Sequence, residues 1–246
     1  MKIGIKTFEY FPELRSFDKK IDFIEIMAIE DKDYSEFKTF NIPIVIHCQH
    51  QAWGVNLADK TKYLRNLKAI NYAIKIADML GAKKIIVHSG ELINENCSVE
   101  NSLKFLEKFN DSRILIENLP LQNPPISLCS SFENTQDYLK KSGKGFCFDI
   151  NHAIIREIGN KEAYLRIIKK FITLNPQHFH FGGQDLNYKS HLNFKDSVLD
   201  IKKILSLLPN NAEITLETTI GLKDLKEDLA IIRGFIDRSI VGGMLG

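Results

Sequence analysis

The chain has 246 residues, of which 44% are hydrophobic and 26% charged, and its formal net charge is +2. This composition is typical of a globular protein with a large core, and the near-neutral charge excludes an overall basic field for nucleic-acid binding. No apolar run approaches the roughly 18 residues of a membrane span, so we predict no membrane partner. The N-terminal segment lacks the apolar stretch of a signal peptide, and the four cysteines are far apart. Both observations indicate a reduced, cytoplasmic protein.

Eight short β-branched runs alternate with amphipathic segments along the chain. The predicted strands cover residues 2–7, 23–29, 43–48, 84–90, 113–119, 145–151, 178–183 and 213–219. Helical periodicity follows at 59–81, 98–109, 130–143, 161–174, 194–208 and 222–236, and more weakly around 11–20 and 33–39. Apolar runs bounded by turn residues are typical of buried parallel strands. We therefore predict a single (β/α)₈ barrel domain over residues 1–246. A doubly wound sheet is the alternative, but it usually needs a glycine-rich first loop, and GIKTFEYF is not one.

Histidines and carboxylates gather where the predicted strands end. Glu117, Asp149 and Glu217 each close an apolar run. The histidines, which lie in strands or in the segments after them, are His47, His50, His88, His152, His178, His180 and His191. In a barrel these positions converge at the C-terminal face. Buried carboxylates facing one another repel, and a divalent cation with imidazole ligands relieves the repulsion. The sequence therefore predicts a metal site at the barrel mouth, although a hydrogen-bonded structural role is the preferred interpretation for His50 and His178.

The order of these strand-end residues resembles that of the xylose isomerase-like TIM barrels, a group that includes endonuclease IV and many sugar isomerases and epimerases. By motif the endonuclease IV family is the nearer match. The matching residues are His47 with the Asn-Leu-Ala at 56–58, the His-x-Gly at 88–90, the Glu-Asn at 117–118, the Asp-x-x-His at 149–152, His180, His191 and the Leu-Glu-Thr at 216–218.

The resemblance implies two divalent cations that share Glu117. The implied ligands are His47, His88 and Glu117 for one ion, and Glu117, Asp149, His180 and Glu217 for the other. A third ion is implied at His152 and His191, but Lys189 stands where the family has its aspartate. Either Asp185 replaces that aspartate, or Lys189 itself supplies the positive charge. The ligand types favour Zn²⁺, with Mn²⁺ or Fe²⁺ as alternatives.

Two functions from different classes fit these residues. The first is metal-assisted hydrolysis of a phosphodiester, with DNA at abasic sites as the implied substrate. The second is isomerisation or epimerisation of a small sugar or sugar phosphate at one metal ion, with Glu117 and Glu217 exchanging the proton. His47 and His88 favour the hydrolase, because a single-metal isomerase does not need them as ligands. A barrel that kept the ligands without catalysis is a third interpretation.

The predicted catalytic residues are Glu117, Glu217 and Asp149. The predicted substrate-binding residues are Trp53, Lys189 and Asn118. An aromatic residue in the third loop could insert into a DNA duplex, stack on a sugar ring or cap the loop. Lys189 and the near-neutral charge favour the isomerase. No feature predicts a protein partner.

Overall fold

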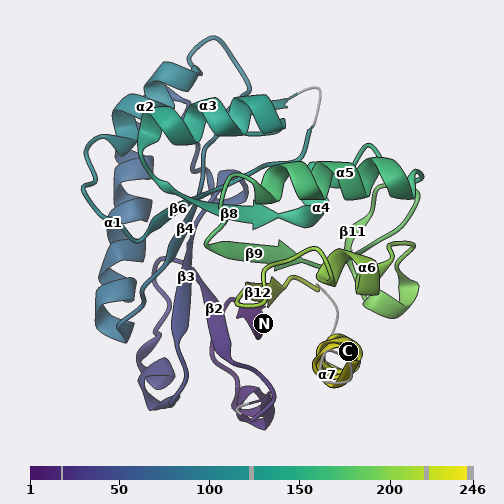
Figure 1. Ribbon diagram of the computed structural model, residues 1–246. Helices are drawn as coiled ribbons and strands as arrows, with labels where there is room; N and C mark the ends of the chain where they lie inside the picture. The colour runs from purple at the N-terminus through teal and green to yellow at the C-terminus, as the bar shows by residue number, and fades with distance from the viewer. Residues whose placement is uncertain (18, 122–124, 219–221, 243–246) are drawn as a thin grey trace.

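The computed structural model describes residues 1–17, 19–121, 125–218 and 222–242, and in it eight parallel strands close into a barrel (Figure 1). The barrel strands are β1 (Lys2–Thr7), β2 (Phe23–Ala28), β3 (Ile44–Cys48), β4 (Ile85–His88), β6 (Ile114–Glu117), β8 (Gly145–Asp149), β9 (His178–Phe181) and β12 (Glu213–Leu216). Their order around the barrel is β1-β12-β9-β8-β6-β4-β3-β2. Each lies within one predicted run, so the (β/α)₈ prediction is confirmed. Residue 219, the last of the run 213–219, lies outside the described residues.

Helices form a layer outside the strands (Figure 1). They are α1 (Tyr63–Leu80), α2 (Val99–Leu106), α3 (Phe132–Ser142), α4 (Ile150–Ile154), α5 (Lys161–Ile172), α6 (Ile201–Leu205) and α7 (Leu222–Gly242). Gly81 ends α1 at φ 69° and Gly143 ends α3 at φ 64°, a left-handed conformation that glycine adopts without strain. In the part of the chain that the structure describes, no helix is long and apolar enough to cross a membrane.

The expected helices differ from the structure at three places. Segments 11–20 and 33–39 contain the 3₁₀ helices η1 (Pro12–Phe17) and η2 (Ser35–Thr39), so the prediction of α-helix there is wrong. Such short segments form too few hydrogen bonds to offset the cost of starting an α-helix. The expected helix 194–208 is divided into η5 (Phe194–Asp196) and α6, because the Asp200 carboxylate accepts a hydrogen bond from the Lys203 amide (2.9 Å) and begins a new helix.

Short elements in the loops after the strands were not predicted from the sequence pattern. They are η3 (Gln51–Trp53), η4 (Lys60–Lys62), the helix α4, and two small antiparallel pairs, β5 (Glu91–Leu92) with β7 (Ile126–Ser127) and β10 (Gly183–Gln184) with β11 (Ser190–Leu192). Two to five residues are too short to show a period of either kind. These elements shape the loops at the barrel mouth.

The inside of the barrel changes from apolar to polar along its axis. A core cluster from five neighbouring strands consists of Phe23, Val45, Ile86, Leu115 and Cys147. Two residues further along the same strands, and therefore on the same face, stand Glu25, His47, His88, Glu117 and Asp149. The apolar layer closes one end of the barrel beneath the polar one, as packed side chains do in this fold.

A buried carboxylate outside the barrel gives a pH-dependent prediction. Asp228 of α7 accepts a hydrogen bond from the Phe194 amide through Oδ1 (2.8 Å), while its buried Oδ2 has no hydrogen-bond partner in the described part of the chain. Burial raises the pKa of Asp228 to about 6. Because this pKa exceeds the unfolded value of about 3.9, the folded protein holds the proton more tightly. The stabilisation is complete below about pH 4 and is lost as the pH rises through 6.

Asp228→Asn keeps the Oδ1 acceptor and removes the titration. Relative to wild type, its free energy of unfolding should therefore rise by about 2–3 kcal/mol between pH 4 and pH 7. Urea unfolding of the metal-free proteins at a series of pH values measures this. Parallel curves for the two proteins would contradict the pKa assignment.

Candidate metal centre

A cavity of about 230 Å³ opens where the barrel strands end. Its lining residues are Lys6, Phe8, Met27, His47, His50, Trp53, His88, Glu117, His152, His191, Glu217 and Thr218. Most of the predicted metal ligands are in this set. The other two, Asp149 and His180, are buried next to it. The barrel therefore brings together all eight residues predicted as ligands, from segments that are far apart in the sequence.

His47, His88 and Glu117 form the first ligand group, on the neighbouring strands β3, β4 and β6. The parallel register places His88 directly beside Glu117. His47 Nε2 lies 3.0 Å and His88 Nε2 3.2 Å from Glu117 Oε2. One ligand atom from each of the three side chains lies within 4.8 Å of the others. Two imidazoles and a carboxylate at this spacing suit zinc or a similar divalent cation.

Glu117, Asp149 and His180 form the second ligand group, on β6, β8 and β9, again with ligand atoms within 4.8 Å of one another. His180 Nδ1 lies 3.4 Å from Glu117 Oε1. Glu117 therefore turns Oε2 toward the first group and Oε1 toward the second. Glu217, the expected fourth ligand, has Oε1 at 3.2 Å from His180 Nδ1, but the same oxygen is 2.5 Å from Lys6 Nζ.

The histidine protons show that the two groups fit cations. His47 Nδ1 lies 2.8 Å from the Cys48 carbonyl, which can only accept, so Nδ1 carries the proton. Burial, with the nearby Lys6 charge, lowers the pKa of His47. The imidazole is therefore neutral, and its Nε2 lone pair faces the Glu117 carboxylate. Two acceptors at 3.0 Å repel each other, and a cation between them removes the repulsion.

His180 of the second group also directs one ring nitrogen at carboxylates, but here the nitrogen is protonated. Its Nε2 donates to Glu25 Oε2 (3.0 Å), while the buried Nδ1 makes no hydrogen bond with the described residues, although carboxylate oxygens of Glu117 and Glu217 are close. Burial alone would lower the pKa of His180, but Cys147, Glu217 and the other carboxylates raise it. In the metal-free protein a proton therefore occupies the place that suits a metal ion.

Asp149 is the carboxylate most affected by the crowding. Burial, together with Glu217 and Glu117, raises its pKa to about 8. Its carboxylate accepts a hydrogen bond from the His152 amide (2.7 Å) and begins α4. Asn118 fixes the backbone of Asp149 from both sides, since its Oδ1 accepts from the Asp149 amide and its Nδ2 donates to the Asp149 carbonyl, each at 2.8 Å. A carboxylate held rigidly among other carboxylates needs a cation to ionise at neutral pH.

Two charged residues of this site, Glu25 and Lys6, were not predicted from the sequence. Glu25 is completely buried, and its Oε2 accepts hydrogen bonds from His180, His178 and Thr215. Lys6 Nζ lies between Glu217 Oε1 (2.5 Å) and Glu25 Oε1 (3.3 Å). Both residues stand inside predicted strands that are otherwise mostly apolar. A charged residue on the inward face of a strand was the signal that could have revealed them.

His178 and His50 take part in hydrogen bonds and ring packing. Burial lowers the pKa of His178 to about 4, and its Nε2 lies near Glu25 (3.2 Å) and Thr215 (2.8 Å). His50 stacks on His88, with ring centroids 4.6 Å apart, and burial lowers its pKa to about 2. Both rings are neutral and support the ligand residues beside them.

The third predicted metal position is incomplete. The rings of His152 and His191 lie 6.5 Å apart, centroid to centroid, and their Nδ1 atoms donate to the carbonyls of Asn118 and Glu217 (2.9 Å each). Asp185 is used elsewhere, because its Oδ1 accepts from the amides of Asn187 (2.8 Å) and Lys189 (3.0 Å) in the turn between β10 and β11. Lys189 is exposed on this turn, outside the cavity lining.

Trp53 and Asn118, the other predicted substrate-binding residues, have different positions. Trp53 lines the cavity, and its ring packs edge-on against His50 (4.6 Å between centroids) and near Phe8 (6.2 Å). Arg65 holds this loop through hydrogen bonds to the Trp53 carbonyl. Asn118 is completely buried behind Asp149. Trp53 is therefore placed to meet a ligand, whereas Asn118 positions Asp149.

Comparison with known proteins identifies the family of this chain. The sequence model of the xylose isomerase-like TIM barrel family matches residues 2–235. A search of curated proteins finds no match. Among solved structures, a D-tagatose 3-epimerase-like protein has a TM-score of 0.80 at 19% identity, with 100% of both chains covered.

Two proteins from Thermus thermophilus are also similar in structure. Endonuclease IV has a TM-score of 0.73 at 14% identity, covering 97% of this chain and 100% of its own. The TTHB071 protein, soaked with ZnCl₂, has a TM-score of 0.72 at 19% identity, covering 97% of this chain and 99% of its own. At such identities the likeness concerns the fold.

Proposed function

Because the chain belongs to the xylose isomerase-like TIM barrel family, we propose that it is a metal-dependent phosphodiester hydrolase of the endonuclease IV kind, with abasic-site DNA as its substrate. The observation that carries the proposal is the division of Glu117 between two ligand groups, with Oε2 toward His47 and His88 and Oε1 toward His180. A bridging carboxylate between two adjacent sites is what a two-metal hydrolase requires.

In the proposed enzyme, His47, His88 and Glu117 would hold one ion, and Glu117, Asp149 and His180, with Glu217, the other. When bound, two zinc-class cations would lower the pKa of water and stabilise charge on the oxygens around phosphorus. The protein residues orient the ligands and limit access of water.

Residues around the metal ligands orient the ligand side chains. Glu25 fixes the protonation of His180, and the Cys48 carbonyl fixes that of His47. Trp53 and Phe8 form an aromatic side of the cavity, where the sugar or a neighbouring base of the substrate would pack. His152 and His191 line the opposite part of the proposed site through their links to Asn118 and Glu217.

Cleavage of a defined DNA duplex tests the proposal. Protein loaded with Zn²⁺ or Mn²⁺ should nick a labelled duplex with one abasic site, and a chelator should stop the reaction until the metal is restored. The same duplex without the abasic site is the control. If metal-loaded protein cleaves neither DNA nor other phosphodiesters, the hydrolase proposal is wrong.

A second function is favoured by a different observation. The Oε1 atoms of Glu117 and Glu217 lie 3.4 Å and 3.2 Å from the same His180 nitrogen, and both carboxylates line the cavity. This is the arrangement that a sugar isomerase or epimerase needs to move a proton at one carbon. Incubation of sugars and sugar phosphates in D₂O would reveal that reaction by deuterium incorporation, and its absence across the panel would count against this second candidate.

A further inference from the structure

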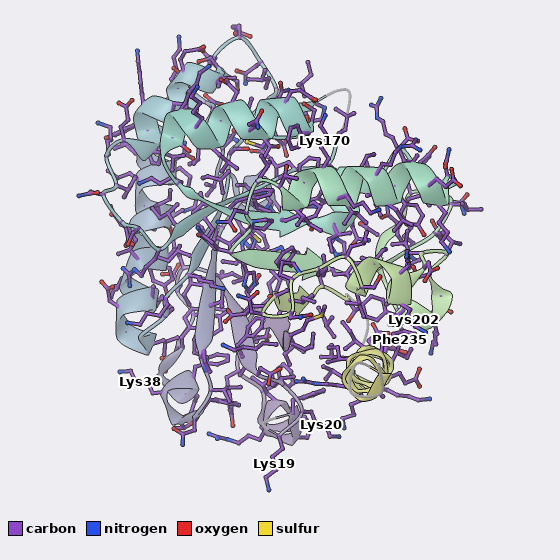
Figure 2. The ribbon with its side chains drawn as sticks, in the orientation of Figure 1. Lys19, Lys20, Lys38, Lys170, Lys202 and Phe235 are labelled. Carbon is purple, nitrogen blue, oxygen red and sulfur yellow. The ribbon has the colours of Figure 1, made fainter. Side chains whose placement is uncertain are left out.

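Lys6 differs from the lysines on the surface of the molecule. Figure 2 labels Lys19, Lys20, Lys38, Lys170 and Lys202, all of which lie on the outer segments and are exposed. The Lys6 side chain instead lines the cavity and is only 15% exposed. It comes from the first barrel strand, on the inward face. A buried ammonium at the mouth of a candidate active site requires a specific explanation.

The charge balance of the site supplies that explanation. The four buried acidic side chains of the polar layer and its rim are Glu25, Glu117, Asp149 and Glu217. Two divalent cations would neutralise them. The ammonium of Lys6 is then the remaining positive charge, and it faces the cavity in which the substrate would bind. A singly charged phosphodiester oxygen would balance it.

The hydrogen-bonding capacity of Lys6 leaves room for such a ligand. An ammonium has three donors. One of them is used in the hydrogen bond to Glu217 Oε1 at 2.5 Å, whereas Glu25 Oε1 at 3.3 Å is an ion-pair partner that accepts no hydrogen bond from the described residues. The two carboxylates attract Nζ to this position, and because the side chain lines the cavity, a donor that Glu217 does not use can reach a bound anion.

The third metal position gives an independent reason. The resemblance implies that one aspartate and two histidines hold the third ion. A divalent ion together with its aspartate would add a single positive charge to the site. Lys189 replaces the aspartate but lies exposed on the turn between β10 and β11. Lys6 adds the same single charge from the opposite side of Glu217, whose other carboxylate oxygen lies 3.6 Å from His191 Nδ1.

We propose that Lys6 contacts the substrate and binds a phosphoryl oxygen, in the role that a third metal ion would otherwise have. The preferred substrates are therefore anionic and bear a phosphoryl group, whereas neutral free sugars are poor ligands. This inference rests on the proposed hydrolase function, because it takes the ligand to be a phosphoryl group.

Binding of inorganic phosphate to the metal-loaded protein, measured by calorimetry, tests the inference without turnover. Lys6→Met should bind phosphate about ten- to a hundredfold more weakly than wild type, the usual effect of losing a hydrogen bond to a charged group. Lys6→Gln, which keeps donors for Glu217, guards against misfolding and should show the same weakening. Lys6→Arg should keep most of the affinity. Lys202→Met, at an exposed lysine of α6, is the matched control and should bind as wild type does, and Lys189→Met tests the other candidate lysine.

Elemental analysis of the same samples separates substrate binding from metal retention. All variants should hold as many ions as wild type. The inference is overturned if Lys6→Met and Lys6→Gln bind phosphate normally, if they weaken binding only by losing metal, if Lys189→Met shows the larger loss, or if wild type does not bind phosphate. Failure of the hydrolase proposal would give a different result. Phosphate would still bind through Lys6, but the protein would cleave no phosphodiester.

Discussion

Replacing Glu117 with glutamine should remove both metal ions from the protein and abolish its activity. Glu117 is 1% exposed and is the one side chain shared by the two ligand groups. The neighbouring His88 and His180 lower its pKa well below the usual range despite its burial, so it is ionised and ready to bind cations. A neutral amide is a poor ligand in its place. The turnover rate should fall at least about a thousandfold, which corresponds to about 4 kcal/mol in the barrier.

Elemental analysis and the abasic-site assay on the same sample measure this prediction. Glu95→Gln is the control, because Glu95 is an exposed glutamate in the loop that follows β5. The control should keep its metal and its rate. Circular dichroism should show that Glu117→Gln still folds, since the amide preserves the shape of the side chain. If Glu117→Gln retained both ions, the shared-ligand account would be wrong.

Replacing Glu25 with glutamine should have the second largest effect, although Glu25 is not a predicted ligand. Its Oε2 accepts the Nε2 proton of His180 and thereby directs Nδ1 at the second ligand group. Loss of such a supporting carboxylate typically weakens metal binding about ten- to a hundredfold. The substitution also leaves Lys6 with one buried carboxylate fewer. Breaking a buried ion pair from one side costs about 3–5 kcal/mol of stability.

The two consequences are measured separately, by metal titration and by urea unfolding. The first metal site should keep its affinity, because the Nε2 atoms of His47 and His88 face Glu117. Glu213→Gln is the matched control. Glu213 lies at the start of β12 and pairs with Lys2 and Lys84 in a partly exposed position, so its loss should destabilise the protein less than the loss of the fully buried Glu25. Equal metal affinity in wild type and Glu25→Gln would show that His180 does not depend on this partner.

The sequence predicts the barrel well because most of the strands carry short, mainly apolar runs. It also predicts the strand-end ligands, since the carboxyl ends of all eight strands meet at one face. This reasoning does not identify Glu25 and Lys6, because neither is the last residue of its strand. Whether an interior charge is buried with partners depends on which strands lie next to it in the barrel, and here the four consecutive strands β9, β12, β1 and β2 supply the partners together.

The loops could not be predicted to the same extent. Asp185 and Lys189 are separated by only three residues, and the sequence suggests either as a substitute for the missing third-site aspartate. In the structure the Asp185 carboxylate caps a tight turn and Lys189 lies outside the cavity lining. Local hydrogen bonds of this kind decide loop conformation, and they leave no periodic pattern in a sequence.

The distinction between hydrolase and isomerase depends on the number of metal ions that the site holds. A single-metal isomerase does not need His47 and His88 as ligands, whereas a two-metal hydrolase requires both ligand groups. Metal-to-protein stoichiometry of freshly purified wild-type protein, by elemental analysis with quantified protein, therefore tests the central claim most directly. We predict two ions per chain, with zinc the main element. A single ion that does not increase on titration with zinc would contradict the shared Glu117 site.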